Sequence, residues 1–323
     1  MGCPQNNKPE SYSFFKNIMV YLDAVKGSEN NETPQEVTKE CTSMSSNHYK
    51  NKNPKIAKSI CEQFLKLYKL LNNSVSKPKG DPTYVSVVNF LNYWLNTELK
   101  KKMYNENICV KDFCDNLETY SYGIVDIKMH SNDEIYVIKN DDLENMNILY
   151  NLYSNYYNVY NGSNIVCTAK DTCLEYSKKC FEEYKKGIIK CEKSESDFCK
   201  AIRVFESEYK SLKQQNKSND DFNSKDLITL PSYEEAFNEY LSELKRRNIT
   251  IATISIICSI FGIILILFSL YKFTPFGKWL PINKKDQEKR HVMKEKIYNF
   301  IDNSNEYSTY NKYTPYRFGY NST

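Results

Sequence analysis

The chain has 323 residues, of which 41% are hydrophobic and 26% charged, with a formal net charge of +4. The positive excess lies from Lys272 onward, where ten basic residues stand against five acidic ones, so the preceding 271 residues are close to neutral. A nucleic-acid-binding domain needs a basic face of its own, and this distribution disfavours that class.

The N-terminus shows no secretory signal, because residues 1–25 lack an early basic region leading into an apolar run of about 7–15 residues. Gly2 and Cys3 come close to an acylation signal, although Asn6 stands where serine or threonine is usual. Whether these two residues are acylated stays open. Acylation would place the N-terminus in the cytosol.

Most of the chain before residue 248 carries the apolar periodicity of amphipathic helices. Asn53-Pro54 and Asp81-Pro82 each supply a residue suited to cap a helix, followed by a proline that fits the first turn. The spacing predicts helices over residues 55–71, 83–104, 142–161, 169–191, 196–212 and 232–247. Only residues 121–139 hint at a short β-hairpin. The sequence therefore predicts an all-α domain.

Two polar stretches interrupt this pattern. Residues 27–53 form the first, which contains Cys41 and is expected to be a tethered loop. Residues 213–226 form the second, which is expected to be a stalk between the helical domain and the membrane.

Residues 249–271 form a run of 23 residues without a charge. At about 1.5 Å per residue the run spans roughly 34 Å, enough to cross a hydrocarbon core. Its isoleucine, leucine and phenylalanine residues contribute roughly −4 to −8 kcal/mol to insertion. The alternative, a buried helix of a soluble core, rarely runs uncharged for this length. We expect a single transmembrane helix.

The charges that flank the run favour a cytosolic C-terminus. Six basic residues follow it within about 20 positions and three precede it, and the positive-inside rule places the more basic side in the cytosol. The cluster Lys245, Arg246 and Arg247 keeps the inverse orientation open. The following decapeptide "YKFTPFGKWL" supplies aromatic and basic groups for the headgroup layer, and these expected interface residues are Tyr271, Lys272, Phe273, Phe276, Lys278 and Trp279.

Eleven cysteines occur, and Cys258 lies inside the apolar run. An even number confined to one side of the membrane is typical of an oxidising compartment, although ten reduced thiols are the alternative. Connectivity does not follow from the sequence. The candidate disulfide cysteines are Cys3, Cys41, Cys61, Cys109, Cys114, Cys167, Cys173, Cys180, Cys191 and Cys199.

Groups that could carry chemistry are scarce. No C-x-x-C pair occurs, the three histidines (His48, His130 and His291) lie apart in the sequence, and no glycine-rich phosphate loop is present. We assign no catalytic, cofactor-binding or metal-ligating residue and expect no small-molecule substrate. Four tyrosines recur at near-heptad spacing, which favours the core face of a helix over an exposed binding surface: Tyr150, Tyr153, Tyr157 and Tyr160.

Several segments together resemble a known family. "VVNFLNYWLNTEL", "LYNLYSNYYNVY", "CLEYSKKCFEEYKKGIIKCEKSESDFCKAIRVFESEY", "YKFTPFGKWL" and the tail "NEYSTYNKYTPYRFGYNST" resemble the Plasmodium interspersed repeat (PIR) superfamily, in particular its vivax-type (VIR) members. The resemblance covers nearly the whole chain. It implies a multigene, antigenically variable malaria parasite protein on the infected red-cell surface or on parasite membranes. It also implies roles in immune evasion and host-cell adhesion, and host-cell proteins as partners.

The sequence thus predicts four segments: a helical extramembrane domain (1–212), a stalk and juxtamembrane helix (213–248), a transmembrane helix (249–271) and a cytoplasmic tail (272–323). The expected function is that of a variant antigen, a recognition or adhesion protein without catalysis, whose partners are the lipid bilayer and host-cell proteins. The alternative is an intracellular, membrane-anchored trafficking or structural protein with its large domain in the cytosol.

Overall fold

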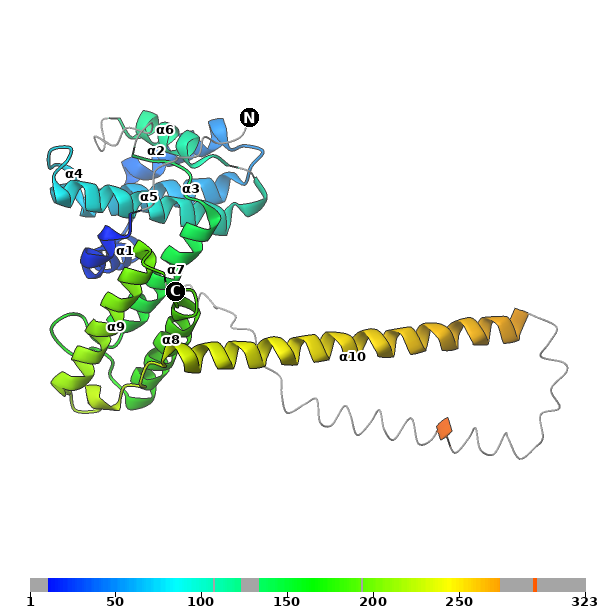
Figure 1. The fold of residues 1–323 in the computed structure, drawn as a ribbon. Coiled ribbons are helices and arrows are strands. Elements are labelled where there is room, and N and C mark those ends of the chain that lie inside the picture. The colour runs from blue at the N-terminus through cyan, green and yellow to red at the C-terminus, as the bar shows by residue number, and fades with distance from the viewer. Residues whose placement is uncertain (1–10, 107, 123–133, 193, 274–292, 295–323) are drawn as a thin grey trace. The chain divides into compact units, whose positions relative to one another are not determined.

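The computed structural model describes residues 11–106, 108–122, 134–192, 194–273 and 293–294 (Figure 1). The described residues form helices and no named strand, so the all-α prediction is confirmed. The elements are η1 (Ser13–Asn17), α1 (Ile18–Asn30), α2 (Gln35–His48), α3 (Pro54–Leu70), α4 (Asn72–Val75), α5 (Pro82–Lys102), η2 (Tyr104–Glu106), α6 (Val110–Ser121), α7 (Asn140–Tyr157), α8 (Lys170–Ile188), α9 (Asp197–Gln215), η3 (Ser224–Asp226) and α10 (Tyr233–Phe273).

The chain divides into two compact units, the first ending at Ser242 and the second beginning at Glu243. In the first unit, α2 packs on α3 and α6, and α3 packs on α5, while α7 packs on α8 and α9 (Figure 1). Helices α1 and α5 join these two groups, because each also contacts α7. One hydrophobic core therefore runs through the whole unit, and it includes Phe64, Leu91, Leu149 and Phe205.

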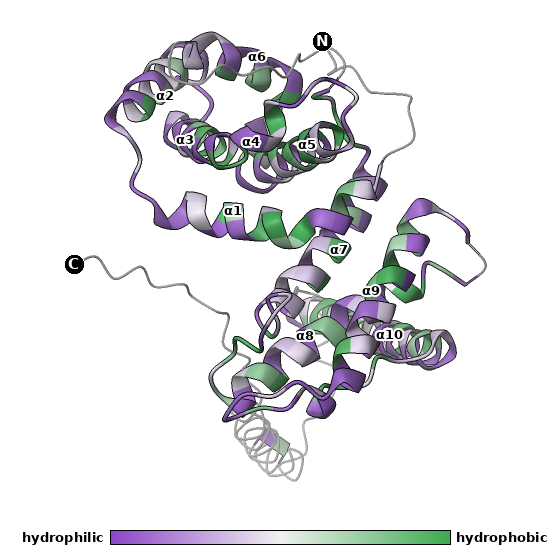
Figure 2. Cartoon of the chain, turned by 90° about the vertical axis from the view of Figure 1, so that its left-hand side faces the viewer, coloured by the Kyte–Doolittle hydropathy of each residue, from purple (hydrophilic) through white to green (hydrophobic). Residues whose placement is uncertain are grey.

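Helices α5 and α9 begin at residues whose side chains cap them, whereas Asn53, the cap expected before α3, makes no capping hydrogen bond through its side chain. Asp81 Oδ1 accepts a hydrogen bond from the Thr83 amide at 2.7 Å at the start of α5. Ser196 Oγ accepts one from the Cys199 amide at 3.3 Å at the start of α9. Each bond satisfies one of the amide donors that a helix N-terminus leaves without an intrahelical partner. Figure 2 shows that the helices of the unit carry both hydrophobic and hydrophilic residues, as amphipathic helices do.

Part of the fold differs from the sequence-based expectation. Helix α2 lies inside the polar stretch 27–53, which was expected to be a loop. Its buried residues Val37, Cys41 and Met44 recur at positions i, i+4 and i+7, a narrow apolar stripe in an otherwise polar helix. Helix α6 was not expected either, and its buried residues Val110, Cys114 and Leu117 also recur at positions i, i+4 and i+7.

The segment expected to be a stalk also packs within the first unit. Phe222, Ser224 and Leu227 are buried there, and η3 contacts α9. Tyr209 Oη donates to the Ile228 carbonyl at 3.0 Å, which holds this return segment against α9. Packing of the helical unit therefore continues past residue 212, and the four predicted segment boundaries stay a prediction.

A second non-helical segment is held by two asparagines of α5. Asn92 Oδ1 accepts from the Tyr136 amide at 3.1 Å. Asn96 donates to the Tyr136 carbonyl at 2.9 Å and accepts from the Ile138 amide at 3.1 Å. Both asparagines are buried, so they replace the hydrogen bonds that a neighbouring strand would give this segment. Most of the expected hairpin, residues 123–133, lies outside the described residues.

Helix α10 continues from the first unit into the second and contains Thr253–Leu270, the one candidate membrane span among the described residues. Its mean hydropathy is 2.6, and none of this span is buried. A core helix of a soluble domain would bury most of such a segment. By length and composition the helix can cross a membrane, in agreement with the predicted transmembrane helix.

Candidate functional site

Three disulfides whose two cysteines both lie among the described residues join six of the ten candidate cysteines. Cys41–Cys61 links α2 to α3, Cys167–Cys173 closes the approach to α8, and Cys191–Cys199 closes the turn between α8 and α9. Their Cα–Cα distances of 5.5–5.6 Å lie in the range that a disulfide requires. Cys109 is disulfide-bonded as well. Cys3 lies outside the described residues.

Cys114 and Cys180 are free thiols, so the expectation that they pair is wrong in this structure. Both are fully buried, each on the apolar face of its helix, where a cysteine serves as a small hydrophobic side chain. Burial raises the pKa of the Cys114 thiol to about 12 and raises that of Cys180 still further above its ordinary value. Both thiols therefore stay protonated and unreactive at neutral pH. Cys258 is free within α10.

The expected interface residues fall at the end of α10 and beyond it. Tyr271, Lys272 and Phe273 form its last three positions, and Lys272 is exposed. Phe276, Lys278 and Trp279 lie outside the described residues. The proposed headgroup belt therefore stays a prediction.

The tyrosine stripe mostly faces the interior. Tyr153 is buried against Phe205, with ring centroids 5.1 Å apart, and Tyr156, which the spacing did not single out, is buried beside it. Tyr150, Tyr157 and Tyr160 are partly buried and pack against the core. Tyr150 also lines a cavity.

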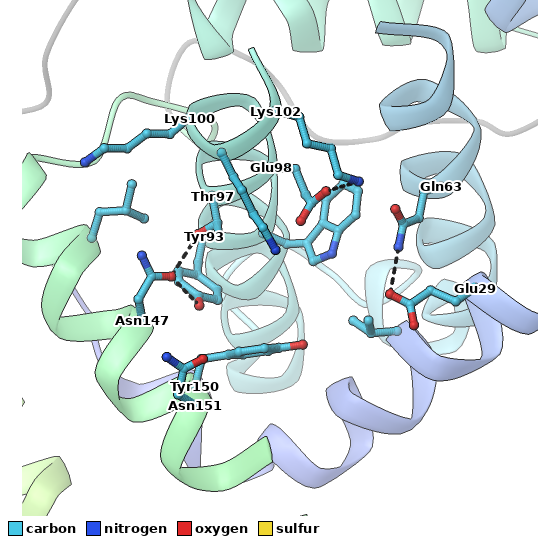
Figure 3. Close-up of a pocket in the computed structure, with 14 residues that line it drawn as sticks. Glu29, Gln63, Tyr93, Thr97, Glu98, Lys100, Lys102, Asn147, Tyr150 and Asn151 are labelled. Atoms are coloured by element: carbon cyan, nitrogen blue, oxygen red, sulfur yellow. Dashed lines mark hydrogen bonds and ion pairs between the residues drawn. The ribbon is translucent and has the colours of Figure 1, made fainter. Parts of the chain in front are cut away.

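That cavity is a concave feature of the first unit. It has a volume of about 550 Å³ and lies between α1, α3, α5 and α7 (Figure 3). Aromatic residues Tyr93, Trp94 and Tyr150 form part of its wall, with the Tyr93 and Tyr150 rings 5.7 Å apart. Polar side chains from all four helices complete it: Glu29, Gln63, Thr97, Glu98, Lys100, Lys101, Lys102, Asn147 and Asn151.

Hydrogen bonds fix several of these groups in place. Tyr93 Oη donates to Asn147 Oδ1 at 2.9 Å and Thr97 Oγ1 does so at 3.4 Å, which orients the amide. Gln63 Nε2 donates to Glu29 Oε1 at 3.4 Å across the mouth between α3 and α1. The partners therefore hold the wall in a set geometry before any ligand enters, which reduces the cost of ordering it on binding.

The charged groups are partly paired among themselves. Lys102 Nζ lies 2.5 Å from Glu98 Oε2, one helical turn away on α5. Lys100 Nζ donates to Asn140 Oδ1 at 2.8 Å. Burial, followed by the nearby carboxylates of Glu29 and Glu98, raises the pKa of Tyr150 well above its ordinary value. The Tyr150 hydroxyl therefore keeps its proton across the physiological range and can donate a hydrogen bond.

Sequence reasoning missed this cavity. The spacing predicts a helix over residues 83–104 but does not indicate which of its side chains border a cavity. Tyr93, Trp94 and Thr97 line the cavity from α5, whereas the neighbouring Asn92 and Asn96 bind the segment at 136–138. Which of them face a common space depends on how α1, α3 and α7 pack on α5.

Candidate catalytic or metal groups do not cluster in the described part of the chain. His48 contacts Tyr120, whose hydroxyl lies 3.3 Å from its Nε2, and His130 and His291 are outside the described residues. The described residues contain no group of three or more histidine, cysteine, aspartate or glutamate side chains that could hold a metal ion.

Comparison with protein families gives a match to the model of the Plasmodium variant antigen protein Cir/Yir/Bir over residues 12–272. The match covers both the helical unit and the apolar part of α10. The chain belongs to this Plasmodium variant antigen family. The resemblance to the PIR superfamily is thereby confirmed. No curated protein matches the chain, and no solved structure does.

Membership of the Cir/Yir/Bir family supports a variant antigen in the broad sense. Together with the apolar helix near the C-terminus, it is consistent with a single-pass membrane protein. The disulfides, the all-α fold and the apolar helix agree with what the sequence predicts for this class.

Proposed function

We propose that this chain is a variant antigen displayed on the infected-cell surface or on parasite-associated membranes, where its helical domain contacts host molecules and supports immune evasion. Its work is recognition or adhesion, and no catalytic role is proposed. The observation that carries the proposal is the Cir/Yir/Bir match over residues 12–272. The partners proposed are the lipid bilayer and host-cell proteins.

The disulfides favour placement of the helical domain outside the cytosol. Disulfides persist in oxidising compartments, whereas cytosolic thiols are kept reduced. All three pairs, Cys41–Cys61, Cys167–Cys173 and Cys191–Cys199, lie before α10. The tail from Lys272 carries the larger basic excess, which favours a cytosolic C-terminus. In this orientation residues 271–279 would lie at the cytosolic headgroup layer.

A second candidate function is that of an intracellular, membrane-anchored trafficking or structural protein with its domain in the cytosol. The cluster Lys245, Arg246 and Arg247 immediately before the apolar span favours it, because these charges would be drawn to the cytosolic side.

Protease treatment of intact infected cells tests the two candidates. Blots with separate antibodies to residues 54–210 and to the tail follow each half of the chain. Digestion of the domain with survival of the tail supports surface recognition. Survival of both until the cells are permeabilised contradicts surface display, and the second candidate would then be pursued through intracellular partners.

A further inference from the structure

The Tyr150 ring gives the cavity between α1, α3, α5 and α7 a face on which a ligand can stack. The side chain is only partly buried, and Figure 3 shows it lying across the cavity with its hydroxyl directed toward the side on which Glu29 lies. An aromatic face carries partial negative charge and attracts weakly positive C–H groups. A ligand with a flat array of C–H groups on one side would fit over this ring.

Around the Tyr150 ring lie hydrogen-bond acceptors and donors that have no partner among the described residues. No described residue donates a hydrogen bond to Glu29 Oε2 or to Glu98 Oε1. The Tyr150 hydroxyl donates no hydrogen bond to a described residue. On the donor side, the Asn147 amide nitrogen and the Lys101 ammonium have no bond within the described part of the chain. Acceptors and donors thus alternate within one small space, which suits a ligand whose groups can both donate and accept.

The charges around the cavity argue against a strongly charged ligand. Two carboxylates, Glu29 and Glu98, stand against the three ammonium groups of residues 100–102. The lysine ammonium groups would repel a cationic ligand, and the glutamate carboxylates would repel an anionic one. A neutral ligand with several hydroxyl groups meets neither penalty, since ionised carboxylate and ammonium both form strong hydrogen bonds to hydroxyls.

We propose that this cavity binds one pyranose ring of a glycan, with its C–H face on Tyr150. Glu29 and Glu98 accept hydrogen bonds from ring hydroxyls, while Lys101 and the Asn147 amide donate to the remaining oxygens. The volume of about 550 Å³ lies in the range of about 300–1,000 Å³ that small-molecule sites occupy, so a ring with an attached second sugar can enter. The partner class is therefore a glycosylated surface.

This inference deepens the proposed recognition function and rests on it for the biological partner alone. Binding itself is tested on purified full-length chain in lipid nanodiscs. The probes are the methyl glycosides of glucose, galactose, mannose and N-acetylglucosamine, followed by saturation-transfer NMR and titration. We expect at least one neutral probe to bind with a dissociation constant on the order of 1 mM, a magnitude usual for a single small ligand at an open site.

Variants locate the site. Tyr150→Ala, which removes the stacking face, and Glu29→Gln, which keeps the shape of an exposed side chain, should each weaken binding about tenfold. Tyr150→Phe keeps the ring and should lose less than Tyr150→Ala. The matched control is Tyr122→Ala, because Tyr122 is 90% exposed and lies outside the cavity, and its binding should equal that of the unmodified chain.

Three results would overturn the inference. They are failure of all four neutral probes to bind, binding that Glu29→Gln and Tyr150→Ala leave unchanged, and binding of N-acetylarginine amide or inorganic phosphate in preference to every neutral sugar. The last would show a cation or anion site in place of a sugar site. An inward-facing domain in the protease experiment would remove surface display without affecting these measurements, so the two failures are distinguishable.

Discussion

Asn96 connects two backbone groups of the segment at residues 136–138 to helix α5. It donates to the Tyr136 carbonyl and accepts from the Ile138 amide, and it is only 7% exposed. Replacing it by leucine leaves two buried backbone groups without their partner, at a cost of about 1–3 kcal/mol. We expect Asn96→Leu to lower the thermal unfolding midpoint of the full chain by several degrees in detergent, as followed by circular dichroism.

Asn105→Leu is the control for this change, because Asn105 is exposed on η2 and its loss should shift stability by no more than about 0.5 kcal/mol. Equal midpoints for Asn96→Leu and the control would mean that the segment at 136–138 is held by other contacts.

Reaction with an alkylating agent distinguishes the free buried thiols of Cys114 and Cys180 from the disulfide-bonded cysteines. In the folded chain, alkylation by iodoacetamide at pH 8.5 should leave Cys114 and Cys180 unmodified, because burial blocks access and keeps both thiols protonated. Denaturation without reductant should expose both, while Cys41, Cys61, Cys167, Cys173, Cys191 and Cys199 should react only after reduction. Peptide mass mapping reads each site. Alkylation of the six paired cysteines without reductant would contradict the disulfides and the oxidising compartment together.

The raised pKa of Cys114 also makes the free energy of unfolding depend on pH. The pKa of Cys114 is about 12 in the folded chain against 9.0 for an unperturbed thiol, so the unfolded chain releases this proton first. Its contribution to the free energy of unfolding is therefore complete below about pH 9 and falls as the pH rises from 9 toward 12.

At the scale of elements, Gly187 lets α8 approach α9 closely. A Cβ at this position would lie 2.6 Å from Ile202 Cδ1 and 3.3 Å from Ile148 Cγ2, and Ile202 is completely buried. Gly→Ala within a helix usually stabilises by about 0.4–1 kcal/mol. Here overpacking should outweigh that gain at about 1–3 kcal/mol, so Gly187→Ala should lower the midpoint of thermal unfolding.

A double variant tests the cause. Ile202→Val removes the Cδ1 atom and alone should cost about 0.5–1.5 kcal/mol. Combined with Gly187→Ala it should recover part of the stability, since the added methyl then occupies the vacated space. A strictly additive loss in the double variant would show that the close approach at Gly187 is not the reason for the effect.

Local patterns explain which elements were predictable from the sequence. Helices α3, α5, α7 and α9 each bury five or more large apolar residues, so their periodicity is visible in the residues alone. Helix α2 exposes most of its surface and buries only a narrow stripe, so its composition resembles that of a loop. The pairing of Cys173 with Cys167 rather than with Cys180, on the same face of α8, depends on the path of the preceding segment. Spacing within a helix cannot specify that path.

At the scale of the whole molecule, long-range contacts decide what the sequence leaves open. Glu29, Gln63, Glu98 and Asn147 come from four different helices, and their convergence on one cavity has no signature in any single segment. The helical fold and the uncharged span, by contrast, were predictable from the sequence, because amphipathic helices and a long apolar run differ in composition. Family membership followed from motifs spread along the chain.

The orientation of the chain in the membrane depends on the charges that flank the apolar span. Replacing the six cations Lys272, Lys278, Lys284, Lys285, Lys289 and Arg290 by glutamine leaves Lys245, Arg246 and Arg247 as the more basic flank. The positive-inside rule then predicts that a substantial fraction of chains inserts with the helical domain in the cytosol. Protease protection in microsomes, with antibodies to residues 54–210 and to a tail epitope, measures that fraction.

The reciprocal variant serves as the control. Substituting glutamine at Lys245, Arg246 and Arg247 widens the charge difference in favour of a cytosolic tail, so the fraction with a translocated domain should stay the same or rise. Because about 248 residues precede the span, translocation of a folded domain could override flanking charge, and long segments obey the rule less strictly. If both variants insert as the unmodified chain does, the domain and not the flanking charge sets the orientation. The disulfides would then be the better guide to the side on which it lies.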